Sequence, residues 1–170
     1  VTRRDLFVRG AAAALALACP SAAKTAFMAG TATVEITPEK GLWMAGFARR
    51  TQPAQGTALP LKAKALAFRY ADARPAVLVT TDLLGLTARL TDAVAREVRE
   101  RTGIPRSHLL FNASHTHCGP VVDEQLAVAY DLSAEQWRGI RAYTAALEKK
   151  LADLVTAPAS TLRPPPLAFA

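Results

Sequence analysis

The run Ala76-Val77-Leu78-Val79-Thr80 is continuously apolar up to its last residue, and the polar pair Thr81-Asp82 follows it. Runs of this kind are typical of strands that are covered on both faces of a sheet. Apolar residues then recur at helical spacing over 88–102, and a second apolar run occupies 109–114. A strand, a helix and a strand in this order form a βαβ unit, whose two strands are normally parallel. We therefore expect an α/β fold with one βαβ unit at 76–114.

Further strands are expected before this unit, and a long helix after it. The segment 31–37 alternates apolar and polar residues with the period of a half-buried strand, and 61–70 is a second candidate strand. Ser133 and Gln136 match a capping box, which an apolar stripe at helical spacing follows, and Pro158 is expected to end that helix. The sequence thus predicts a mixed or mostly parallel sheet with flanking helices.

The composition is that of an ordinary globular domain, with 51% hydrophobic and 21% charged residues in a chain of 170. The only long apolar run, 10–18, is far shorter than the roughly 20 residues of a helix that crosses a bilayer. Two cysteines, Cys19 and Cys118, exclude a disulfide-scaffolded miniprotein. The net charge of +7 does not by itself indicate a nucleic-acid partner. The basic residues are interspersed with acidic ones, as in 96–101, which is typical of a solvated helix face.

The first residues have the features of an export signal. Thr2-Arg3-Arg4-Asp5-Leu6-Phe7 resembles a twin-arginine motif, and Ser21-Ala22-Ala23 offers small residues for cleavage. We expect 1–23 to be a signal peptide and the mature protein to be periplasmic or secreted. An amphipathic first helix is the alternative, and lipidation of Cys19 is a minor one.

The strongest chemical signal is the segment Ser114-His115-Thr116-His117-Cys118-Gly119-Pro120, at the end of the second strand of the βαβ unit. In extended backbone, alternate side chains point the same way, so the two imidazoles are expected to approach one centre. Neutral imidazole is a good zinc ligand, whereas ordinary surface histidines are the alternative. Cys118 comes directly after His117, so in extended backbone it would point to the opposite face, and it is expected to be a small buried residue. His108 stands alone before the strand and is expected to lie on the surface.

Asp82 is expected near the two histidines. The carboxyl ends of parallel strands meet at one edge of a sheet, where α/β proteins usually place their sites. Asp82 would then orient a histidine ring or bind a metal itself. The alternative is that its carboxylate caps the turn at 83–87. The connection 39–60 is long and rich in Gly, Pro, Gln and Arg, which is typical of a loop that frames a site.

Five blocks of the sequence, taken in order, resemble the N-terminal domain of the neutral/alkaline non-lysosomal ceramidases. Together they extend through most of the chain after the expected signal, and the block with the two histidines is the most specific. The blocks are 29–38, 44–47, 61–65, 79–82 and 112–120.

The resemblance implies a zinc-dependent amidohydrolase that cleaves the N-acyl amide of ceramide, or of a similar lipid amide, to sphingosine and a fatty acid. It implies that His115 is a zinc ligand, that His117 is a catalytic residue beside the metal, and that Asp82 lies near the site. Cys118 stands where the family usually has serine. Peripheral contact with a membrane would suit such a substrate.

The resemblance also implies that 30–170 is the N-terminal part of a larger catalytic domain. The family's other zinc ligands, a histidine, a glutamate and a tyrosine, lie further downstream, and strands of this part would be left with exposed apolar faces. Two alternatives stay open: an inactive, truncated exported domain, and a related metal-dependent hydrolase of another amide or ester.

Overall fold

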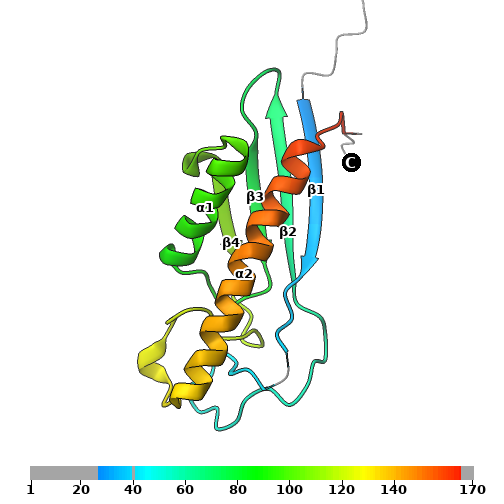
Figure 1. Cartoon of the computed structure of the whole chain (residues 1–170). Helices are drawn as coiled ribbons and strands as arrows, with labels where there is room; N and C mark the ends of the chain where they lie inside the picture. Colours follow the sequence, from blue (N-terminus) through cyan, green and yellow to red (C-terminus); the bar gives the residue numbers. More distant parts are fainter. Residues whose placement is uncertain (1–26, 40, 166–170) are drawn as a thin grey trace, which may run out of the picture.

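The computed structural model describes residues 27–39 and 41–165. The expected signal peptide, 1–23, and Cys19 lie outside the described residues. The chain forms one four-stranded sheet in the order β1-β2-β3-β4, with two long helices on one of its faces (Figure 1). The strands are β1 Phe27–Glu35, β2 Lys62–Tyr70, β3 Ala76–Thr81 and β4 Leu109–Ala113.

The sheet is mixed, because β1, β2 and β3 pair antiparallel whereas β3 and β4 pair parallel. The crossover between the parallel strands is helix α1, Ala88–Thr102, so the expected βαβ unit and α/β class are confirmed. Thr87 caps the start of α1 by accepting from the N–H of Leu90, and Gly103 ends it with a left-handed φ of 74°.

The second long helix, α2, spans Ala134–Ser160 and packs along the same face of the sheet as α1. Ser133 and Gln136 form the expected capping box. The prediction that Pro158 ends the helix is wrong, because α2 continues through Pro158 to Ser160. A proline removes its own N–H bond, but its carbonyl still accepts, and the N–H of Thr161 donates to it at 3.3 Å.

The core lies between the sheet and the helices. Small residues on the inner face of β2 let the helices approach closely, and branched residues fill the space around them. Among the buried core residues are Ala63, Ala65 and Ala67 of β2, Val77 and Val79 of β3, Leu90, Val94 and Val98 of α1, and Leu147, Leu151 and Val155 of α2.

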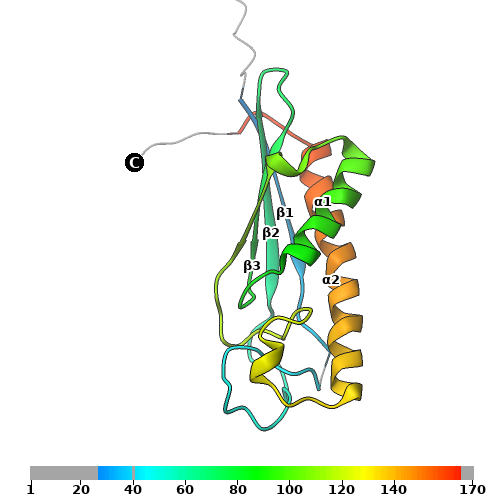
Figure 2. The same ribbon diagram turned by 90° about the vertical axis from the view of Figure 1, so that its left-hand side faces the viewer.

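Among the described residues, no helix lies on the other face of the sheet (Figure 2). Leu66, Phe68 and Tyr70 of β2 alternate with its buried alanines and are exposed, as is Leu110 of β4. The expectation that 76–80 is covered on both faces is therefore wrong for the part of the chain that the structure describes: Leu78 lies half-buried on the open face. Within 27–39 and 41–165, no helix is long and apolar enough to cross a membrane.

Candidate functional site

The two histidines follow β4 in a loop that leaves the sheet at once. The N–H of Ser114 still donates to the carbonyl of Thr81 at 2.9 Å, but His115 has a left-handed φ of 60°. The expectation of extended backbone is therefore wrong at this point. The turn nevertheless brings the two rings together, since the centroids of His115 and His117 are 5.2 Å apart with 67° between the ring planes.

His115 is held by a backbone carbonyl. Its Nδ1 lies 2.8 Å from the oxygen of Leu84, in the segment that follows β3. A carbonyl oxygen only accepts hydrogen bonds, so this contact places the ring proton on Nδ1 and leaves the lone pair of Nε2 free. The residue is exposed. The contact therefore orients the ring, and in the neutral imidazole it leaves Nε2 as the nitrogen available to a metal.

His117 is half-buried against the loop that follows Trp43. The ring of Phe47 meets it edge-on, with centroids 5.1 Å apart. Gly46 has a φ of 100°, and a Cβ on it would lie 2.6 Å from the Cγ of His117. The N–H of Gly46 donates to the hydroxyl of Tyr130 at 3.1 Å. His117 is thus enclosed by groups far away in the sequence.

Asp82 is engaged elsewhere. Its Oδ2 accepts from the backbone N–H of Lys62 at 2.9 Å, which ties the end of β3 to the start of β2. The alternative reading, in which the carboxylate caps the turn 83–87, does not match this hydrogen bond. Among the described residues, Asp82 has no hydrogen bond to either histidine, and no group of three or more His, Cys, Asp or Glu side chains is placed to hold a metal. Its role near a metal stays a prediction.

Two other expectations fail in part. Cys118 is exposed, not buried, because the chain turns at 115–118 and the alternation of an extended strand no longer applies. Its N–H donates to the hydroxyl of Thr116 at 3.2 Å. His108 is half-buried instead of lying fully on the surface, with Nδ1 3.1 Å from the carbonyl of Pro75.

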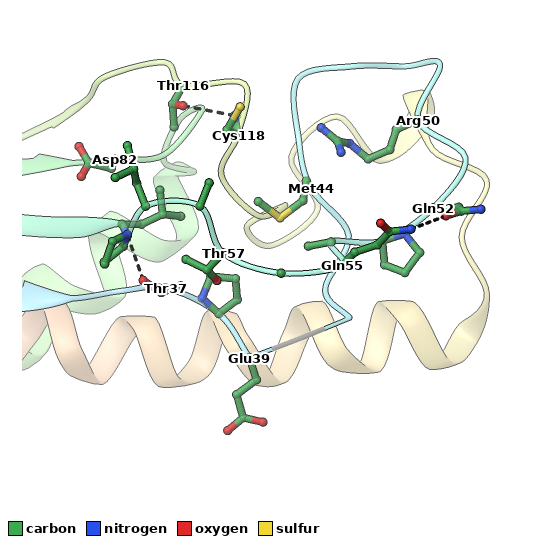
Figure 3. Close-up of a pocket in the computed structure, with 18 of the residues that line it drawn as sticks. Thr37, Glu39, Met44, Arg50, Gln52, Gln55, Thr57, Asp82, Thr116 and Cys118 are labelled. Carbon is green, nitrogen blue, oxygen red and sulfur yellow. Dashed lines mark hydrogen bonds between the residues drawn. The ribbon is translucent and has the colours of Figure 1, made fainter.

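A cavity of about 960 Å³ lies beside the histidine loop (Figure 3). The connection between β1 and β2 supplies most of its wall, as its length and composition predict. Asp82, Ser114, Thr116 and Cys118 complete the wall at the ends of β3 and β4. Thr116 therefore faces the cavity, whereas the histidines on either side of it are not among the lining residues of the described chain.

The segment after the histidine loop is anchored to both helices. Asp123 accepts hydrogen bonds from the guanidinium of Arg89 at 2.7 Å and from the hydroxyl of Thr87 at 2.9 Å, while its own N–H donates to Thr144 of α2 at 2.8 Å. The hydrogen bond from Arg89 holds the pKa of Asp123 below its usual range, against the opposing effect of burial. These contacts fix the chain beyond Pro120.

Sequence reasoning missed the groups that position the histidines, namely Leu84, Gly46 and Tyr130. The block 44–47 is part of the family resemblance, but nothing in its local pattern indicates that Gly46 contacts a histidine 71 positions later. A carbonyl such as that of Leu84 is present at every residue and gives no sequence signal at all.

Comparison of the sequence with protein-family models and with curated proteins finds no match. Solved structures do match the fold. One, described as a ceramidase complexed with C2, has a TM-score of 0.67 and 18% identity over 83% of this chain. Another, neutral ceramidase from Pseudomonas aeruginosa, has a TM-score of 0.62 and 19% identity, again over 83% of this chain. The chain has a ceramidase-like fold and spans 22% of the length of each of these proteins.

Proposed function

We propose that this chain supplies one wall of a zinc-dependent amidohydrolase site that acts on a ceramide-like lipid amide. The observation that carries the proposal is the hydrogen bond from His115 Nδ1 to the carbonyl of Leu84, which leaves Nε2 free to bind a metal. The fold likeness to ceramidases supports the same family of reactions. It does not favour the alternative of an inactive exported domain.

In this proposal His115 is a zinc ligand and His117 is the residue next to the metal. Zinc, when bound, lowers the pKa of a bound water and polarises a carbonyl oxygen. We propose that His117 donates a hydrogen bond to the amide oxygen of the substrate. The support is that Phe47 and Gly46 contact its ring, whose centroid lies 5.2 Å from that of His115.

The described residues fit part of a zinc site. A catalytic zinc usually takes three protein ligands, and the histidine loop offers two imidazoles at most. The proposal therefore requires further ligands from outside the described residues. It also includes export, for which the support is the twin-arginine motif within 1–23.

Zinc titration of the purified product of the complete open reading frame, which would supply the further ligands, tests the ligand assignment. His115→Ala is expected to weaken zinc binding by at least the roughly 10–100-fold that losing a mere supporting partner of a ligand costs. His108→Ala is the matched control, since His108 contacts the carbonyl of Pro75 in the same manner but lies apart from the loop. Both variants are made with Cys19→Ser and Cys118→Ser, so that thiols do not bind the metal.

Calorimetry or a competing zinc dye reads out the affinity without any need for enzyme activity. Equal zinc affinity in His115→Ala and the parent protein would contradict the assignment. So would an equal loss in His108→Ala, because it would show that zinc binds histidines of this chain without regard to their placement.

A further inference from the structure

Arg50 is a cationic side chain in the wall of the large cavity, and part of its guanidinium has no partner. Its Nε is buried and donates to no acceptor among the described residues. None of the ion pairs formed within 27–39 and 41–165 includes Arg50. Burying a donor without an acceptor costs free energy, which a bound acceptor would recover.

The side chain is directed into the cavity. Figure 3 shows Arg50 reaching from its loop toward Met44 and Cys118, whereas the carboxylate of Glu39 points away. Asp82, the other carboxylate of the wall, already accepts from the N–H of Lys62. The two arginines of the wall, Arg49 and Arg50, equal its two carboxylates in number, but among the described residues neither carboxylate forms an ion pair with Arg50, whose buried Nε stays open to an acceptor from a ligand.

Arg50 also lies close to the histidine loop. The Cζ of its guanidinium is 5.8 Å from the centroid of the Phe47 ring, and the same ring contacts His117. Stacking of this kind keeps a guanidinium in place while its N–H groups stay available to a ligand. An anionic group bound by Arg50 would thus be separated from the histidines by one aromatic ring.

Part of the remaining wall suits an aliphatic chain, although polar residues also line the cavity. The apolar residues that line the cavity include Met44, Pro53, Ala54, Ala58, Leu59 and Leu61. A volume of about 960 Å³ is at the upper end of the usual range for small-molecule sites. A cavity with apolar residues along part of its wall and a buried, unpaired Nε on Arg50 matches a molecule with an alkyl chain and an anionic end.

We propose that the cavity binds a fatty acid, with its carboxylate on Arg50 and its alkyl chain along the apolar wall. The inference rests on the proposed function, because a fatty acid is the acid product of hydrolysing a lipid amide. In that reaction the C–N bond breaks, water supplies the new oxygen, and a carboxylate and an amine form. Arg50 is then a product-binding residue, since a guanidinium binds a carboxylate more strongly than it binds the oxygen of a neutral amide.

Calorimetric titration of the chain with sodium octanoate, and separately with octanamide, tests the proposal. Arg50→Gln is expected to weaken octanoate binding at least about tenfold, the effect of losing a charge-assisted hydrogen bond. Octanamide binding is expected to weaken by a smaller factor, because a hydrogen bond to the neutral amide oxygen is about half as strong as one to a carboxylate. Arg50→Lys is expected to restore part of the octanoate affinity, since it retains the charge.

Arg49→Gln is the matched control, because Arg49 lines the same wall and has the same charge but is exposed. An equal loss in Arg49→Gln and Arg50→Gln would overturn the proposal, as would an equal loss of octanoate and octanamide or the absence of saturable binding. All titrations contain EDTA. The zinc titration of His115→Ala contains no fatty acid, so either proposal can fail without the other.

Discussion

Gly46 occupies a place beside His117 where a side chain has no room. Its φ of 100° is left-handed, and a Cβ would lie 2.6–2.8 Å from three atoms of His117. Gly46→Ala is therefore expected to lower the free energy of unfolding by about 2–4 kcal/mol, the sum of backbone strain and overpacking. Urea unfolding measures this loss, and the ring resonances of His117 are expected to shift because its position must change.

Gly56→Ala is the matched control for this substitution. Gly56 lies on the same connection between β1 and β2, but a Cβ there meets nothing within 4 Å. Its substitution is expected to change stability by no more than about 0.5 kcal/mol. If Gly46→Ala were as mild as Gly56→Ala, the contact of Gly46 with His117 would not be a constraint on the site.

For some residues of the site a functional role can be inferred from the sequence alone, and for others it cannot. His115 and His117 stand out because imidazole has distinctive chemistry and the two are close in sequence. Arg50 has no such signal, because an arginine in a polar loop is usually solvated. Its significance comes from the burial of Nε and from the contact with Phe47, and both depend on how the loop folds.

Most elements match their expected ranges, including the strands expected at 61–70, 76–80 and 109–114, whereas the start of the first strand does not. The helix 88–102 matches α1 because its cap, its apolar spacing and Gly103 are all local. The first strand was expected at 31–37, but β1 is Phe27–Glu35. Its start is fixed by pairing of Phe27 with Tyr70 of β2, a contact that the alternation of residues does not encode.

Asp123 joins the start of α1 to the middle of α2, so its ionisation is expected to affect stability. Its folded pKa is lowered, mainly by the hydrogen bond from Arg89. A group with a lowered folded pKa stabilises the protein above its unfolded pKa of about 4, and the stabilisation is lost as pH falls through the folded value. Asp123→Asn is therefore expected to flatten the fall in unfolding free energy below about pH 4.

Urea unfolding at a series of pH values measures this effect. Asp92→Asn is the control, because Asp92 also pairs with an arginine, Arg106, but its side chain is 66% exposed. Exposed pairs contribute little to stability, so the pH dependence of Asp92→Asn should follow that of the parent. An unchanged slope in Asp123→Asn would show that the pair with Arg89 is not coupled to folding.

On the scale of the whole molecule, the described part of the chain is a sheet with its helices on one face. The register of the strands places Leu66 opposite Leu78, and Leu78 opposite Leu110, so that leucines form a continuous stripe across β2, β3 and β4 on the open face. The family resemblance implies such an uncovered face. Composition alone gives no such indication, because the apolar run of β3 is equally consistent with a strand covered on both faces.

This open face is expected to make the chain bind hydrophobic dyes and to limit its solubility, because a contiguous apolar patch next to an edge strand favours association. Leu110→Lys places a charge on β4, the edge strand, and is expected to lower the fluorescence of bound anilinonaphthalene sulfonate and to raise solubility. Leu110 is 64% exposed, so stability should change by no more than about 0.5 kcal/mol.

Val128→Lys is the control, since Val128 is fully exposed in the short helix 127–129, outside the four strands, and its substitution should leave dye binding unchanged. If both lysine variants lowered the fluorescence equally, net charge and not the leucine stripe would govern the surface behaviour of the chain.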